Sequence, residues 1–112
     1  MRTVDFKLEE KTYQLKLTTS NLVQLERKLG AHPMTLLMDI ENNILPKTED
    51  LLWILFYALQ WKYENSFEDF ESVESLYDKY VDEGNDYTKL IVVIVELFRV
   101  SGLIPNNKRK NL

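Results

Sequence analysis

The sequence predicts an α+β fold that is mostly helical, with an N-terminal β-hairpin packed on a bundle of about five helices. Residues 4–17 alternate between apolar and polar side chains, as half-buried strands do. Most of the remaining chain carries apolar side chains at helical spacing, and each of the three glycines stands alone where a helix should stop. The 112 residues suffice for one domain, which we place at residues 1–104, followed by a flexible basic tail at 105–112.

The hairpin is predicted from two alternating segments joined by a polar turn at residues 9–12. An isolated two-stranded hairpin is marginal in water, so its apolar face must lie against the helices that follow. An exposed strand edge would also allow self-association. The apolar positions are Val4, Phe6, Leu8, Tyr13, Leu15 and Leu17.

The first two helices follow directly. Residues 18–20 are all good N-cap residues, and Gly30 suits the end of an amphipathic helix over residues 20–29. Pro33 suits the first turn of a short second helix, which ends at residues 41–43.

The later helices begin with a central one from residue 49 to about 63. Ser66, with Asp69 three residues on, resembles a capping box and predicts the start of an amphipathic helix that ends at Gly84. The last helix begins at residue 85 or 86 and is closed by Gly102.

The charge is distributed unevenly along the chain. Residues 64–86 carry nine carboxylates against Lys79 alone, although the whole chain has a net charge of only −4. An acidic stretch repels phosphate, so we expect no binding of nucleic acid. The N-terminus lacks the apolar core of a signal peptide, and the longest apolar run is half a membrane span, so we expect a soluble intracellular protein without membrane attachment.

No combination of residues indicates catalysis, a cofactor or a metal. There are no cysteines, and His32 is the single histidine, which we interpret as a surface or capping residue. The acidic segment lacks the spacing of a calcium loop, and no glycine-rich phosphate loop is present. We therefore expect no enzyme activity, no catalytic residues, no cofactor and no metal.

The chain has more apolar helix surface than a domain of this size needs. The segments 51–61 and 90–100 are apolar nearly all round, which indicates that part of their surface faces a partner. The alternative is that these residues are simply core. We assign partner contact to Trp53, Phe56, Tyr57 and Trp61, with Phe98, Leu103 and Ile104 as a second candidate patch.

Three stretches of the chain are distinctive, namely TVDFKLEEKTYQLKLTTSNLVQLERKLG, EDLLWILFYALQ and SLYDKYVDEGNDYTKLIVVIVELFRVSGLI. In this order they resemble the small tail assembly chaperones of siphophages and prophages in Gram-positive bacteria. The resemblance covers about residues 3 to 104. The most distinctive parts are VDFKLEEKTYQLKLTT, NLVQLERKLG and the closing FRVSGLI.

The resemblance implies a non-enzymatic protein in the cytoplasm of the bacterial host that is absent from the mature virion. Members of that family are thought to bind the helical tape-measure protein, keep it soluble and recruit the major tail protein. They are also commonly made in a second, longer form by ribosomal frameshifting. A groove between helices that receives an amphipathic helix would suit this role.

A rival interpretation is a small acidic inhibitor, a decoy that mimics nucleic acid and occupies a basic groove on another protein. Such binding would collapse between low and moderate salt, whereas capture of an apolar helix should persist. The carboxylates that would imitate phosphates are Glu68, Asp69, Glu71, Glu74, Asp78 and Asp82.

Overall fold

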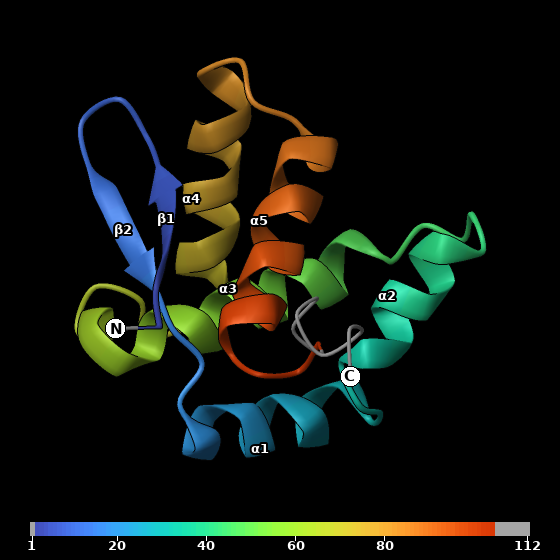
Figure 1. The fold of residues 1–112 in the computed structure, drawn as a ribbon. Helices are drawn as coiled ribbons and strands as arrows, with labels where there is room; N and C mark the ends of the chain where they lie inside the picture. Colours follow the sequence, from blue (N-terminus) through green and yellow to red (C-terminus); the bar gives the residue numbers. More distant parts are fainter. Residues whose placement is uncertain (1, 105–112) are drawn as a thin grey trace.

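The computed structural model describes residues 2–104 and confirms the α+β fold, with an antiparallel hairpin followed by five helices (Figure 1). The basic tail predicted at residues 105–112 lies outside the described residues. The elements are β1 (Val4–Lys7), β2 (Thr12–Leu15), α1 (Thr19–Leu29), α2 (Met34–Glu41), α3 (Thr48–Tyr63), α4 (Phe70–Asp82) and α5 (Tyr87–Val100).

The hairpin packs its apolar face on the helices, as its alternation predicts. Phe6 pairs with Tyr13 across the strands, is fully buried, and stacks on the ring of Tyr80 from α4 at 4.5 Å between centroids. At the tip of the hairpin, the Glu9 N–H donates to the carboxylate of Glu83 at 2.9 Å. The hairpin is thus fixed along one face and at its tip.

The outer edge of β2 is closed by α3. The Gln14 N–H donates to the Tyr63 hydroxyl at 3.0 Å, and the Trp61 indole Nε1 donates to the Gln14 carbonyl at 2.9 Å. Just beyond the strand, the Lys16 N–H donates to the carbonyl of Ala58 at 3.0 Å. These bonds satisfy backbone groups that a bare strand edge would leave open.

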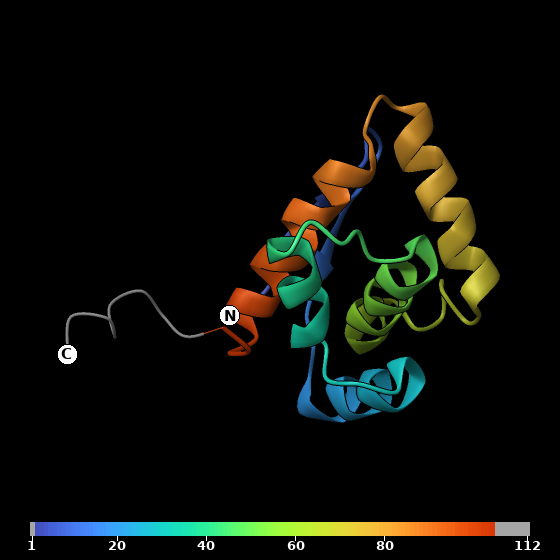
Figure 2. The same ribbon diagram turned by 90° about the vertical axis from the view of Figure 1, so that its right-hand side faces the viewer.

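Helix α3 is the centre of the molecule and contacts α1, α4, α5 and β2 (Figures 1 and 2). Because it is surrounded, it can be apolar on nearly every side, and most of its apolar surplus is core. The largest fully buried side chains of the core are Phe6, Leu15, Leu25, Leu51, Ile54, Leu55, Leu59, Val73, Leu90, Ile94, Leu97 and Phe98.

Most helix ends lie where the sequence predicts them. The Thr18 hydroxyl accepts from the backbone at the start of α1, and Gly30 ends that helix in the left-handed region, with φ of 71°. The Asp86 carboxylate accepts from the Lys89 N–H at 3.0 Å and caps α5. In both helices the cap is made by residues next to the helix end in the sequence, so local signals suffice to predict it.

The predicted start of α4 at Ser66 is wrong. The helix begins at Phe70, and its N-cap is Asp69, whose carboxylate accepts from the Ser72 N–H at 2.9 Å. The physical reason is Phe67, whose side chain is only 5% exposed in the core, so that the chain reaches inward before the helix starts.

Candidate partner-binding site

The structure brings three of the four predicted contact residues together. Trp53, Phe56 and Tyr57 of α3 form an aromatic cluster with Phe70 of α4. The Trp53 ring lies 4.2 Å from Phe70 and 5.5 Å from Phe56, and the Phe56 ring lies 5.1 Å from Tyr57. All are half-buried, so the cluster joins α4 to α3 and leaves only part of each ring accessible.

The fourth residue, Trp61, lies apart from the aromatic cluster. Its indole N–H is bound to the carbonyl of Gln14, and Lys16 Nζ lies 5.3 Å from its ring centroid. The side chain therefore contacts the hairpin, and its hydrogen bond gives it a structural task.

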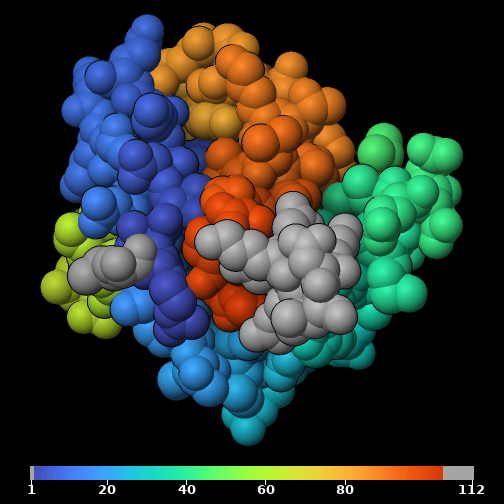
Figure 3. Space-filling model, in the orientation of Figure 1, coloured from blue at the N-terminus to red at the C-terminus, as the bar shows by residue number. Residues whose placement is uncertain are grey.

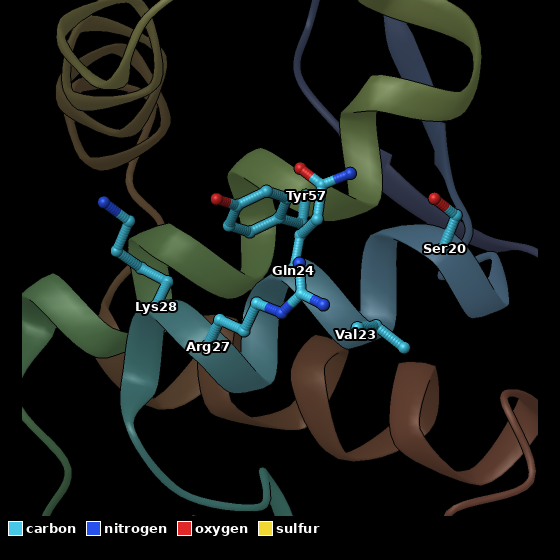
Figure 4. A pocket seen from close by; sticks show the side chains of 6 residues that line it. All are labelled: Ser20, Val23, Gln24, Arg27, Lys28 and Tyr57. Atoms are coloured by element: carbon cyan, nitrogen blue, oxygen red, sulfur yellow. The ribbon is translucent and has the colours of Figure 1, made fainter.

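A hollow of about 830 Å3 runs along α1 beside the aromatic cluster (Figure 4). Tyr57 is its one lining residue from α3, and the other five come from α1. In Figure 4, the Tyr57 ring and the side chain of Gln24 are seen next to each other, with Lys28 on the far side of the ring from Gln24. We call this hollow the α1–α3 groove, and it is lined by Ser20, Val23, Gln24, Arg27, Lys28 and Tyr57.

The α1–α3 groove combines apolar surface with positive charge. Val23 is 38% exposed, and Arg27 and Lys28 are exposed beside it. Lys28 Nζ lies 4.3 Å from the centroid of the Trp53 ring, a cation–π contact that links the groove to the aromatic cluster. Among the described residues, no carboxylate forms an ion pair with either cation.

The second candidate patch is wrong at its centre. Phe98 is fully buried in the core, while Leu103 and Ile104 are half-buried against it. Since α5 packs on both α3 and β1, this end of the helix is interior and offers no aromatic surface.

Sequence reasoning missed an apolar surface on α2 and the loop after it. Met38 is 57% exposed, Ile44 55% and Leu45 72%, while Leu36 is the buried residue of α2. Figure 1 shows α2 at the right-hand side of the molecule, and in Figure 2 this helix faces the viewer. The sequence did contain a signal for this surface. Ile44 and Leu45 lie in a loop between a helix end and Pro46, so their apolar side chains belong to no amphipathic helix face.

The acidic residues line a different hollow. Glu71, Glu74 and Asp78 of α4 face a hollow of about 560 Å3 next to Thr48. The six carboxylates of the rival interpretation are all exposed, but Asp69 is engaged as an N-cap. Three of the six carboxylates thus line one hollow, and Asp69 has a structural role at the start of α4.

The structure also shows where the single histidine lies and bears on the metal-site and membrane predictions. His32 is exposed, which agrees with the surface position expected for it, and its Nδ1 accepts from the Met34 N–H at 3.1 Å, although the N-cap of α2 is Pro33. Within residues 2–104, no three histidine or acidic side chains are grouped as metal ligands. In the same range, every helix is too short or too polar to cross a membrane.

Comparison with known proteins gives one match. A family model described as "Family of unknown function (DUF6096)" matches residues 1–112. No curated protein and no solved structure matches the chain.

Proposed function

We propose that this chain, which belongs to the family of unknown function DUF6096, is a non-enzymatic tail assembly chaperone that binds an amphipathic helix of a tape-measure protein. The observation that carries the proposal is the α1–α3 groove, where the exposed Val23 and the ring of Tyr57 share a lining with Arg27 and Lys28. Neither cation forms an ion pair among the described residues. The choice of the tape-measure protein as partner rests on the resemblance of the sequence to tail assembly chaperones.

The length of the groove suits a bound helix. Its lining on α1 extends from Ser20 to Lys28, eight residues apart, which is about 12 Å at the rise of an α-helix. An amphipathic helix would place about two turns of its apolar stripe against Val23 and Tyr57. A tape-measure chain offers such stripes repeatedly, so several weak contacts along one rod would add up through multivalency.

The charges select which helix is bound. Arg27 and Lys28 border the groove, and none of its lining residues is acidic. A helix with carboxylates flanking its apolar stripe would meet opposite charge on this side, whereas a basic helix would be repelled. The preferred ligand is thus an amphipathic helix with an acidic flank.

The four residues assigned from sequence take different roles in this proposal. Tyr57 contacts the helix directly, because it lines the groove. Trp53 and Phe56 hold Tyr57 in place from behind. Trp61 stabilises the hairpin and lies outside the contact.

The rest of the proposal follows the resemblance. The chaperone acts in the cytoplasm of the bacterial host, recruits the major tail protein to the coated tape measure, and leaves before the virion is complete. It uses no cofactor and no metal.

The test is co-expression with the tape-measure protein encoded nearby. We expect the tape measure to become soluble and to co-purify with the chain at moderate salt. A tape measure that stays insoluble with both the chain and its frameshifted form would contradict the proposal. The double variant Arg27→Glu, Lys28→Glu should lose the effect, while Lys47→Glu, an exposed lysine outside the groove, should keep it.

A second candidate function is the acidic decoy, which the hollow beside Glu71, Glu74 and Asp78 favours. Its partner would be a protein with a basic groove. Raising the salt from low to moderate would release that partner, because exposed charges are screened. The chaperone complex would persist in the same titration.

A further inference from the structure

Helix α2 leaves an apolar side uncovered. Leu36 is the one buried residue within this helix, whereas Met38 is exposed, as are Ile44 and Leu45 in the loop that follows. In Figures 1 and 3, α2 and this loop form the right-hand edge of the molecule, and α1 lies along its lower edge. The apolar side of α2 is therefore accessible to another molecule.

The charges of α2 and of the α1–α3 groove are opposite. Residues 34–46 carry Asp39 and Glu41 but no lysine or arginine, and among the described residues neither carboxylate forms an ion pair. The negative end of the helix dipole adds to this charge, because the last turn of α2 contains no basic residue. The groove, in contrast, is bordered by Arg27 and Lys28 and by no acidic residue. α2 is thus an amphipathic helix of the kind that the groove prefers.

The two surfaces also match in length and in the spacing of their side chains. α2 has eight residues, about 12 Å at the rise of an α-helix, which is the length of the groove along α1. On α1, the exposed Val23 lies one turn before Arg27, and on α2 the exposed Met38 lies one turn before Glu41. Parallel helices with Met38 beside Val23 would therefore bring Glu41 beside Arg27. An antiparallel arrangement would move Glu41 toward the other end of the groove, so the charges select parallel packing.

We propose that, in the absence of another ligand, the α1–α3 groove binds α2 of a second copy of this chain. Met38 of the second copy packs on Val23 and Tyr57, and its Glu41 pairs with Arg27. The two contacting surfaces are different parts of the chain, so the contact is heterologous. Each added copy offers a further groove, and association is not limited to two copies.

This inference goes beyond the proposed function, because the occupant of the groove is the chain itself and the test contains no tape-measure protein. A tape-measure helix and α2 of a second copy would compete for one groove. At chain concentrations too low for self-association the groove is empty. Changes to Met38 then leave the affinity for a tape-measure helix unaltered, so the two claims can fail separately.

Sedimentation velocity of the full chain over a range of concentrations tests the proposal. The wild type should sediment faster as its concentration rises. Arg27→Glu and Glu41→Lys should each raise the dissociation constant of self-association by about tenfold or more, because each places like charges together. The double variant that carries both changes should associate more tightly than either single variant, since this pair is again of opposite sign.

A mixing experiment tests which surfaces meet. Val23→Gln changes only the groove and Met38→Gln changes only α2, so each variant alone should stay monomeric at concentrations where the wild type associates. An equimolar mixture should form a 1:1 dimer and nothing larger. The intact α2 of the Val23→Gln copy enters the intact groove of the Met38→Gln copy, and the surfaces that remain are both altered.

The matched controls are Val92→Gln on α5 and Asp82→Lys at the end of α4. Both residues are exposed and lie outside the two contacting surfaces, so these variants should associate as the wild type does. Circular dichroism melting should show that all variants fold. A wild type that is monomeric at every concentration, association that survives Arg27→Glu or Glu41→Lys, or a mixture that fails to form the 1:1 dimer would each overturn the proposal.

Discussion

The aromatic side chains of α3 have different roles: one lines the groove, and others hold the hairpin. Tyr57 lines the groove, whereas Trp61 and Tyr63 are bound to the backbone of Gln14. The sequence could identify these aromatic residues but could not predict which neighbour each side chain contacts. Because α3 is apolar nearly all round, its periodicity marks no single buried face. Only the position of the hairpin decides that Trp61 is structural.

Removing either bond to Gln14 should destabilise the protein. We expect Trp61→Phe and Tyr63→Phe each to lower the free energy of unfolding by about 1 kcal/mol, because each leaves a part-buried backbone group without its partner. Tyr57→Phe is the control, since its hydroxyl bonds to no described residue. Urea denaturation measures the three differences, and equal values for Tyr63→Phe and Tyr57→Phe would contradict this account.

The cap of α5 should make part of the stability depend on pH. The Thr88 hydroxyl and, more weakly, the Lys89 N–H hold the pKa of Asp86 below its ordinary value. Because the pKa is lower in the folded state, the stabilising contribution is present above the unfolded pKa of about 4 and is lost as the pH falls through the folded pKa.

The matching variant is Asp86→Asn, which can still cap a helix but does not titrate. We expect wild type to be the more stable at pH 7 and the gap in unfolding free energy to narrow below about pH 4. Urea denaturation of both proteins between about pH 7 and pH 3 measures this gap in unfolding free energy. A gap that is constant with pH would contradict the role given to the carboxylate.

At the scale of elements, local sequence signals predicted the hairpin, five helices and most helix ends. The exception is the start of α4, where Ser66 and Asp69 are both acceptable caps by sequence. The choice depends on Phe67, which is buried against Tyr13, with 5.4 Å between ring centroids. A contact between residues so far apart in the chain leaves no trace in local propensity.

The two caps can be compared directly. We expect Asp69→Ala to lower the free energy of unfolding by about 1 kcal/mol, because it removes the acceptor for the Ser72 N–H. Ser66→Ala should have almost no effect, since its hydroxyl lies outside the helix. Chemical denaturation of both variants provides the measurement, and a larger loss for Ser66→Ala would restore the capping box expected from sequence.

At the scale of the whole molecule, charge separates into surfaces of opposite sign. Cations of α1 border the groove, and carboxylates of α4 line the second hollow. The acidic surface was visible in the sequence because its residues all lie within the short segment 64–86. The groove was not, because it needs α1 to pack on α3 and brings Tyr57 beside residues some thirty positions earlier.

Two surfaces compete as the place where a partner helix binds. One is the α1–α3 groove, with the exposed Val23 in its lining, and the other is the exposed apolar surface that includes Met38 on α2. Both residues are exposed and helical, so each can be changed to glutamine with little cost to the fold.

The central claim, that the α1–α3 groove binds an amphipathic helix, is tested most directly by titration calorimetry with an acidic-flanked amphipathic helix of the tape-measure protein. We expect Val23→Gln to weaken binding by about tenfold, the loss of one well-packed apolar contact, and Met38→Gln to bind as wild type does. Wild-type affinity for Val23→Gln together with weakened binding for Met38→Gln would contradict the claim and place the site on α2.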